Sequence, residues 1–582
     1  MKLMSLGAVL VSLSLVSCQT QRQTLQPELA RQLDGIFAKW DRADSPGCAL
    51  GIYKDGQIIY GRGYGIADLN DDVPITPTTV FHVASMSKQF TAASILLLAQ
   101  RGKLSLDDDV HKYIPELPDF GKVITLRHLL HHTSGLRDQW SLLELAGWRM
   151  SQDLITDDDV MSVVVRQRTL DFTPGERYMY SNTGFTLLGI IVQRVSGVSL
   201  REFTTKNIFE PLGMTRTHFR DDHEEIIKHD ALGYEQDGED KPFRMNLTNF
   251  DTVGATSLHT TVEDLQRWDE NFYHPRIGGS EFIRQMLERG KLNGGEELDY
   301  ASGLVISSYE GLPTVEHGGA DAGYRSDLIR FPEQHFSIAV LCNLANTDPT
   351  ALARQVADIL LARELKPPTH PRDSAKASGA VMTGEKIATM AGVYWGREED
   401  EFMTLRLKNG KLQINMGRGD FQELKSFAPA HFHVANVSWG DNVDIHLVAA
   451  DTAGAGHVEE TFVGEWPKMY EPVPAFDTAA AELAEYPGEF VSLETEPVYR
   501  ISLQAGELTL LRLKHKPDML RPVMRDVFVG EIGTVRFTRD AHRHVSGFIL
   551  DAGRIQNFKF VKKRGLEAGD CQLKLPQVVR PV

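Results

Sequence analysis

The sequence has few cysteines and few clusters of basic residues. Its 582 residues include only four cysteines, and the formal net charge is −17 at pH 7. A nucleic acid is a polyanion, and a protein that binds it needs a basic surface. Here the one run of three basic residues is Lys562-Lys563-Arg564. We therefore expect no nucleic-acid partner.

The cysteines also argue against a scaffold held together by disulfides. Besides Cys18, which belongs to the N-terminal targeting segment described next, the chain has Cys48, Cys342 and Cys571. An odd set cannot pair completely. Cys48 and Cys342 each lie in a strand-like apolar stretch. We expect both to be buried as small apolar side chains rather than to have a redox role.

The N-terminal apolar run, from Leu3 to Val16 behind Lys2, is too short to span a bilayer and is typical of a signal peptide. It ends in Leu15-Val16-Ser17-Cys18, which resembles a bacterial lipoprotein box. This resemblance implies a signal peptide over residues 1–17, acylation of Cys18 and a lipidated tether over residues 18–25. The protein would then be anchored in the cell envelope facing the periplasm, and Gln19-Thr20 is compatible with the outer membrane. The alternative is an ordinary signal peptide.

The length predicts several domains, because 582 residues exceed what one hydrophobic core normally supports. Residues 366–384 have the proline-rich, small-residue composition of a linker. Beyond it, strand-like blocks repeat with one offset: 96 residues separate Gly392 from Gly488 and also Gly410 from Gly506. We predict two homologous all-β modules, residues 385–480 and 481–582, each a barrel of about eight strands.

The stretch from Ser85 to Lys88 carries the first candidate chemistry. It precedes a run of helix formers, residues 91–100, that ends at Gly102, so a helix is predicted to begin near Ser85. Lys88, three residues on, returns to the same helix face. An amine whose pKa is lowered can take the serine proton, and the helix start offers free N–H groups to an oxyanion. Alone, this pair is common.

Two further motifs follow at suitable distances. Tyr180-Ser181-Asn182 precedes an apolar helix, and in an extended loop both outer side chains point the same way. His317-Gly318-Gly319 lies in the first of three consecutive strand-like segments that read as an antiparallel sheet. Each motif alone has an ordinary structural explanation, whereas three in this order are specific.

With these motifs, residues 26–365 resemble the serine β-lactamase and penicillin-binding-protein superfamily, in the branch with class C β-lactamases, D-aminopeptidases and esterases. The resemblance implies an α/β (α+β) domain whose antiparallel sheet is covered by helices. It implies a nucleophile at Ser85, with Lys88 and Tyr180 sharing the role of base, and which of them takes the serine proton stays open. Asn182 and His317 complete the catalytic set, and the oxyanion and substrate would contact Ser85, Gly318, Gly319 and Ala320.

His317 departs from most β-lactamases of the superfamily, which have lysine at this position. A histidine is largely neutral at pH 7, so recognition of anionic β-lactams is doubtful. His-Gly-Gly is similar to the third motif of D-aminopeptidases, which also carry two C-terminal barrels, with one barrel loop at the cleft. The resemblance therefore implies an acyl-enzyme hydrolase for small D-amino-acid amides or peptides. Arg325 is expected to be solvated, the alternative being a carboxylate anchor.

The sequence indicates no metal site and no cofactor. His128, His131 and His132 lack a carboxylate or thiolate at ligand spacing. The alternatives to an aminopeptidase are an esterase, a β-lactamase, a D,D-carboxypeptidase and, from another class, a non-catalytic cell-wall-binding lipoprotein. The oligomeric state stays open.

Overall fold

The computed structural model describes residues 25–238, 241–366, 389–397, 401–408, 410–416, 421–428, 430–434, 443–448, 456–462, 468–474, 476 and 480–563. The predicted signal peptide, the acylation site Cys18, Cys571 and nearly all of the predicted linker 366–384 lie outside these residues. The predicted domain boundaries stay predictions.

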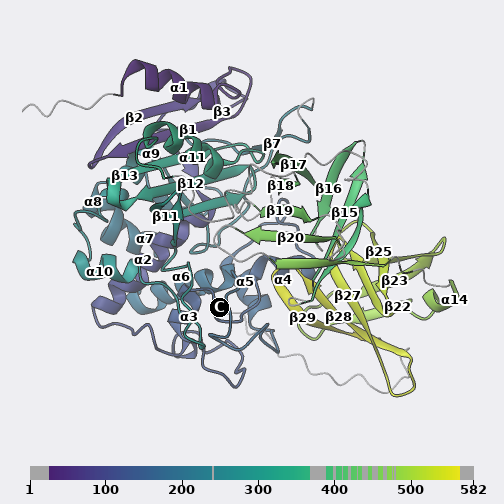
Figure 1. The fold of residues 1–582 in the computed structure, drawn as a ribbon. Helices are drawn as coiled ribbons and strands as arrows, with labels where there is room; N and C mark the ends of the chain where they lie inside the picture. The colour runs from purple at the N-terminus through teal and green to yellow at the C-terminus, as the bar shows by residue number, and fades with distance from the viewer. Residues whose placement is uncertain are drawn as a thin grey trace, which may run out of the picture.

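One antiparallel sheet organises the N-terminal domain, and in the described residues its strand order is β10-β11-β12-β13-β1-β2. Strands from both ends of the domain thus lie side by side at its centre (Figure 1). The three strands predicted around and after His317 are present as β11, β12 and β13. The bounds are β1 Cys48–Lys54, β2 Gln57–Tyr64, β10 Val305–Tyr309, β11 Leu312–Asp321, β12 Tyr324–Phe331 and β13 Phe336–Cys342.

Both faces of the inner strands β12, β13 and β1 are buried, as the strand sequences require. In β13, Ile338 and Val340 pack with helices α1 (Pro27–Phe37) and α11 (Pro349–Leu360), whereas Ala339 and Leu341 point into the main core on the opposite face. This follows from the two-residue period of a strand. The sheet is therefore a fixed platform for the residues at the end of β11.

A helical region packs on the main-core side of the sheet, around α2. From Lys88 to Leu98 every side chain of α2 is buried, so this helix lies inside the domain. The bounds are η1 Ala84–Ser87, α2 Lys88–Gln100, η2 Val110–Lys112, α3 Leu126–Leu130, α4 Gln139–Leu145, α5 Asp157–Val164, α6 Asn182–Ser196, α7 Leu200–Thr204, η3 Thr205–Phe209, α8 Glu210–Leu212, α9 Val262–Glu270, α10 Gly279–Met286 and η4 Pro332–Gln334.

Short strand pairs connect these helices to the sheet. Among them, β9 lies between β5 and β6 and brings residue 258 next to the turn that contains Ser85. The bounds are β3 Ile66–Asp68, β4 Val73–Pro74, β5 Phe81–His82, β6 His218–Phe219, β7 Tyr234–Glu235, β8 Arg244–Met245 and β9 Leu258–Thr260.

The C-terminal third forms two closed barrels, each with eight strands among the described residues, as the repeat predicted (Figure 1). Gly410 and Gly506 occupy equivalent turns, with φ of 76° and 86°, a conformation that favours glycine. The bounds are β14 Gly392–Gly396, β15 Glu401–Lys408, β16 Lys411–Asn415, β17 Gln422–Ala428, β18 His431–Val434, β19 Val443–Val448, β20 His457–Phe462, β21 Lys468–Val473, α14 Ala480–Leu483, β22 Gly488–Val491, β23 Tyr499–Gln504, β24 Glu507–Leu511, β25 Asp518–Met524, β26 Val527–Gly530, β27 Gly533–Arg539, β28 Val545–Ala552 and β29 Ile555–Lys562.

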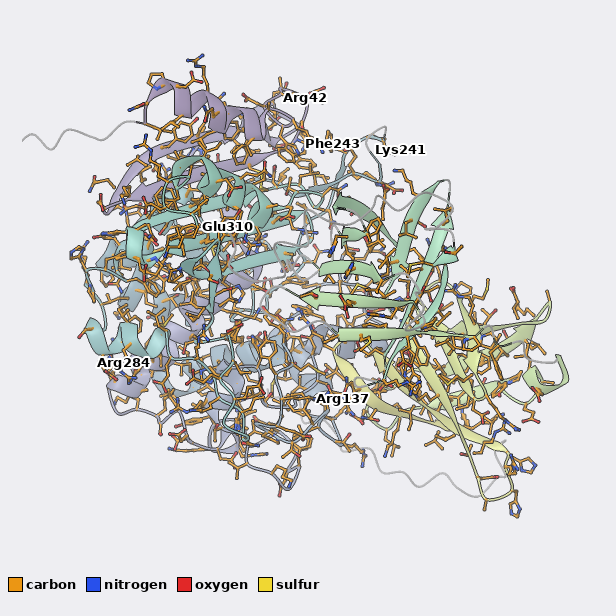
Figure 2. The ribbon with its side chains drawn as sticks, in the orientation of Figure 1. Arg42, Arg137, Lys241, Phe243, Arg284 and Glu310 are labelled. Atoms are coloured by element: carbon orange, nitrogen blue, oxygen red, sulfur yellow. A yellow bond between two sulfur atoms is a disulfide. The ribbon has the colours of Figure 1, made fainter. Side chains whose placement is uncertain are left out.

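The second barrel packs directly against the helical region, and its interior belongs to the same hydrophobic cluster as the N-terminal domain. Arg137, labelled in Figure 2, lies at this junction and is fully buried. It bonds Asp171 in its own domain and, in the second barrel, Glu494 and the carbonyl of Gln556. A buried cation needs such partners, so this junction has a defined geometry.

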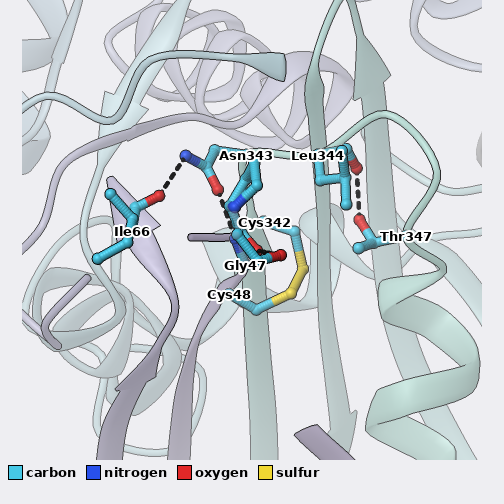
Figure 3. Close-up of a disulfide and its surroundings, with 9 residues drawn as sticks. Gly47, Cys48, Ile66, Cys342, Asn343, Leu344 and Thr347 are labelled. Carbon is cyan, nitrogen blue, oxygen red and sulfur yellow. Dashed lines mark hydrogen bonds between the residues drawn. A yellow bond between two sulfur atoms is a disulfide. The ribbon is translucent and has the colours of Figure 1, made fainter. Parts of the chain in front are cut away.

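Cys48 and Cys342 form a disulfide, so the prediction of two reduced buried side chains is wrong (Figure 3). Both are fully buried as predicted, but they face each other in the register of β1 and β13, with their Cα atoms 4.0 Å apart. Such pairing requires that the two strands be neighbours, which is a property of the sheet order and not of either local sequence.

In the described part of the chain no single helix has the length and apolar character of a membrane span. One bent pair, Asn182–Ser196 with Leu200–Leu212 at 75°, passes the same criteria only when its two helices are taken together.

Candidate active site

The candidate nucleophile lies in a 3-10 turn directly before the central helix. η1 contains Ser85, and α2 begins at Lys88, slightly later than the sequence predicted. Ala84, just before the serine, has φ of 47°, a left-handed conformation that is costly for a residue with a side chain. Ser87 holds this turn, because its hydroxyl donates to the Ala84 carbonyl and accepts from the N–H of Leu258 at 3.0 Å.

Lys88 is fully buried and has three hydrogen-bond partners. Its Nζ lies 2.9 Å from Ser85 Oγ, 2.8 Å from Asn182 Oδ1 and 2.8 Å from the carbonyl oxygen of Ala255. The two carbonyl oxygens can only accept a hydrogen bond, whereas the serine hydroxyl can also donate. A neutral amine donates to the two carbonyls and keeps its lone pair for the serine proton. This geometry is the one a general base requires.

The electrostatic surroundings favour that neutral form. Burial lowers the pKa of Lys88 well below its usual value, and the positive charge of Arg554 lowers it further. The carboxylates of Asp138 and Asp321 act in the opposite direction. The arrangement therefore favours the uncharged amine, which is the form that can accept a proton.

Asn182 is held in one orientation by Asp138. The backbone N–H and the side-chain Nδ2 of Asn182 both donate to Asp138 Oδ2, at 2.7 and 2.8 Å. Since a carboxylate accepts hydrogen bonds, the amide oxygen of Asn182 must face Lys88. Asn182 is the first residue of α6, and the preceding Ser181 is extended, which is the condition under which the outer side chains of the motif point the same way.

Tyr180 lies beside Lys88, as the motif predicted. Lys88 Nζ is 4.9 Å from the centroid of the Tyr180 ring. The imidazole of His132 packs on the same ring with centroids 4.1 Å apart, and its Nδ1 accepts a hydrogen bond from the N–H of Ser181. Burial lowers the pKa of His132 well below its usual value, so this histidine is uncharged and lines the site beside Tyr180.

His317 is neutral and its tautomer is determined by its partners. Nδ1 donates to the Gly318 carbonyl at 2.6 Å, so Nε2 accepts from the hydroxyl of Tyr300 at 2.9 Å. Burial lowers the pKa of His317 to about 4. At neutral pH this position therefore carries no positive charge, in contrast to a lysine.

The end of β11 runs directly against the turn that contains Ser85. A Cβ on Gly319 would lie 2.2 Å from the carbonyl oxygen of Val83 and 3.0 Å from the Ser85 nitrogen, so only glycine allows this approach. Ser326 on β12 bonds the same Val83 carbonyl at 2.8 Å. The backbone of Gly318, Gly319 and Ala320 is thus brought to Ser85. The predicted roles of these residues in an oxyanion hole stay predictions.

The structure adds residues that sequence reasoning missed. Asp138, His132 and Tyr300 orient the motif residues, and Arg554 comes from the second barrel. No local pattern marks Asp138, Tyr300 or Arg554, because each reaches the site through the tertiary fold. Arg325, predicted to be solvated, is half-buried, and its guanidinium donates to the carbonyls of Ala322 and Tyr324. Within the described ranges, no group of three His, Cys, Asp or Glu side chains is placed to hold a metal ion.

Comparison with known proteins indicates the same family as the residues of the site do. The profile of the Beta-lactamase family matches residues 31–362. A penicillin-binding protein of Bacillus subtilis is 32% identical over 338 residues, 56% of this chain and 74% of that protein. A D-aminopeptidase of Gluconobacter oxydans is 30% identical over 354 residues, which cover 60% of this chain and 65%, just under two thirds, of that relative.

The solved structure of an octameric penicillin-binding protein homologue from Pyrococcus abyssi aligns with a TM-score of 0.53 and 25% identity. The alignment covers 76% of this chain and 99% of that chain. The chain belongs to the Beta-lactamase family of serine hydrolases, as the three motifs indicated.

Proposed function

We propose that this protein is a serine hydrolase that forms an acyl-enzyme on Ser85. The observation that carries the proposal is the contact of 2.9 Å between Lys88 Nζ and Ser85 Oγ, in a buried site that favours the neutral amine. A serine hydroxyl becomes an effective nucleophile when such a neighbour accepts its proton.

In the proposed reaction, Ser85 Oγ attacks the substrate carbonyl while its proton passes to Lys88 or Tyr180. The oxyanion of the tetrahedral intermediate is stabilised by the N–H groups of Ser85 and Ala320. The proton then goes to the leaving group as the carbonyl–heteroatom bond breaks. Water attacks the acyl-enzyme while the same base accepts its proton. The base then returns the proton to Ser85 Oγ as the acyl–oxygen bond breaks and the carboxylic acid product leaves, which restores Ser85.

We propose small D-amino-acid amides or peptides with a free amino group as substrates. Because His317 is neutral, the site lacks at this position the cation that would bind a substrate carboxylate. Similarity to a D-aminopeptidase supports amides as the substrate class. Asp321, one residue beyond Ala320, has a partly exposed carboxylate that can accept a hydrogen bond from an ammonium group. A cavity of about 450 Å³ next to Asp321, with Trp148 and Phe250 in its wall, offers room for a side chain.

The test is a comparison of four chromogenic substrates and a D-alanyl-D-alanine peptide at equal concentration. We expect release of p-nitroaniline from D-alanine p-nitroanilide, less from the L-enantiomer, and none in Ser85→Ala. Hydrolysis of p-nitrophenyl acetate alone would move the assignment to an esterase. Hydrolysis of a chromogenic cephalosporin in preference to the anilide would move it to a β-lactamase, and release of D-alanine from D-alanyl-D-alanine peptides to a D,D-carboxypeptidase.

We also propose that the protein is exported and anchored to a membrane facing the periplasm through acylated Cys18. The disulfide between Cys48 and Cys342 supports export, because such bonds persist in oxidising compartments. Cells fed an alkyne-tagged fatty acid should label the wild-type chain and not Cys18→Ala. The wild-type chain should fractionate with the membrane, and Cys18→Ala with the soluble periplasm. A mature N-terminus other than Cys18 would contradict the anchor.

A further inference from the structure

The second barrel contributes a charged side chain to the candidate active site. β28 and β29 are joined by a two-residue turn, Gly553-Arg554, in which Gly553 has φ of 61°. The guanidinium carbon of Arg554 lies 4.3 Å from the centroid of the Tyr180 ring, and Nη1 lies 3.8 Å from Asp138 Oδ2. The Arg554 side chain is only 12% exposed. This residue therefore lies among the predicted catalytic groups, about 470 positions after Ser85 in the sequence.

The hairpin that carries Arg554 has a fixed position. The carbonyl of Arg554 accepts the N–H of Asp138 at 3.4 Å. Two residues on, the N–H of Gln556 donates to Asp171 at 3.0 Å and its side chain accepts from Arg177. The buried Arg137, adjacent to Asp138, bonds the carbonyl of Gln556. These contacts hold the turn on both sides, so the position of its cation is part of the fold.

A cation at this place acts on two of the predicted catalytic groups at once. Over the face of Tyr180 it is attracted by the ring, which favours one ring position beside Lys88. Arg554 is also a permanent positive charge that opposes protonation of Lys88. The charged and titratable groups that face Lys88 are Tyr180, Asp138, Asp321, His132, His317 and Arg554. Of these, the carboxylates favour the ammonium form and the cation opposes them.

We propose that Arg554 is a positioning residue of the active site, through which the second barrel holds Tyr180 in place and keeps the Lys88 amine available as a base. This inference rests on the proposed function, since it assigns a role in the activation of Ser85. With this role for Arg554, the second barrel contributes to the active site of the hydrolase and is not only a neighbouring module.

The experiment measures the rate at which a neutral fluorophosphonate labels Ser85 from pH 5 to pH 10. In Arg554→Gln the loss of the cation should raise the pKa of the base, which moves the acid limb of the profile upward by about one pH unit. At any one pH on that limb, the labelling rate of Arg554→Gln should be roughly tenfold lower than that of the wild type. Arg554→Met, which keeps a long side chain, should give the same shift, and Arg554→Lys should restore the wild-type profile.

Arg177→Gln is the matched control, because it removes a cation that contacts the same hairpin at Gln556, outside the catalytic groups. It should leave the pH profile unchanged. If Arg554→Gln and Arg554→Met keep the wild-type acid limb, or if Arg177→Gln shifts it equally, the inference is wrong while the proposed function stands. If wild-type protein is not labelled at Ser85 at any pH, both are wrong.

Discussion

One carboxylate oxygen of Asp138 holds Asn182 twice, through its backbone N–H at 2.7 Å and its side-chain amide at 2.8 Å. The other oxygen accepts the N–H of Trp140 at 3.0 Å and caps α4. Asp138 thus joins two helices and determines which atom of the Asn182 amide meets Lys88. It has this effect without belonging to any of the three motifs.

Asp138→Ala should therefore impair both stability and activity. A buried hydrogen-bonded carboxylate is lost, and we expect the free energy of unfolding to fall by about 1–3 kcal/mol. Because Asn182 can then rotate, kcat/KM should fall by about 10- to 100-fold. Urea unfolding and steady-state kinetics measure the two effects. Ser199→Ala, which removes the cap of α7, is the control that should lose stability only. Equal activity in both variants would contradict the role of Asp138.

Gly319→Ala should reduce acylation with little change elsewhere. The new Cβ would lie 2.2 Å from the Val83 carbonyl oxygen, so β11 must move away from the turn of Ser85. Loss of one oxyanion donor typically costs about 10²–10³ in rate, and we expect an acylation rate lowered by that factor. Gly392→Ala meets no atom within 4 Å and is the control. An unchanged acylation rate in Gly319→Ala would show that the turn does not need this close approach.

Because His317 is held neutral, the stability of the folded protein should fall at acid pH. Its pKa is lowered to about 4 in the folded protein, whereas the usual value is 6.5. Between these values the unfolded chain binds the proton more readily, so the stability present above pH 6.5 is lost as the pH falls toward 4. The loss from this residue is up to about 3 kcal/mol.

Urea unfolding at pH 7 and at pH 4.5 measures this difference. In His317→Gln the free energy of unfolding at pH 7 should exceed that at pH 4.5 by less than in the wild type, and most of the difference of about 3 kcal/mol should disappear. In the control His542→Gln, a change at an exposed histidine of the second barrel, it should stay as in the wild type. An equal difference in wild type and His317→Gln would mean that His317 is not held neutral.

The disulfide should contribute strongly to stability. Cys48 and Cys342 are 294 residues apart, and a bond that closes a long loop restricts the unfolded chain. The double variant Cys48→Ser with Cys342→Ser should unfold with a free energy lower by about 2–5 kcal/mol. Dithiothreitol should lower the wild-type value to that of the variant and leave the variant unchanged. Insensitivity of the wild-type protein to the reductant would contradict the bond.

The sequence predicted those features that depend on neighbours along the chain. Ser85 and Lys88 are three residues apart on one turn, and the two barrels repeat with an offset of 96 residues, so local pattern was sufficient. Glycine spacing also predicted the turns at Gly410 and Gly506.

The features that the sequence did not predict depend on which distant segments meet. The pair Cys48 and Cys342 requires β1 and β13 to be neighbours, and Arg554 reaches Tyr180 only because the second barrel docks beside α4. Asp138 has the ordinary appearance of a helix cap, and its second function is visible only once α6 is in place.

The central claim, that buried Lys88 activates Ser85, is tested most directly by intact-protein mass spectrometry after timed exposure to a neutral fluorophosphonate. We predict one adduct per chain on the peptide that contains Ser85, no adduct in Ser85→Ala, and labelling slower by at least about 10³-fold in Lys88→Met. An adduct at another serine, no adduct at all, or an undiminished rate in Lys88→Met would contradict the claim.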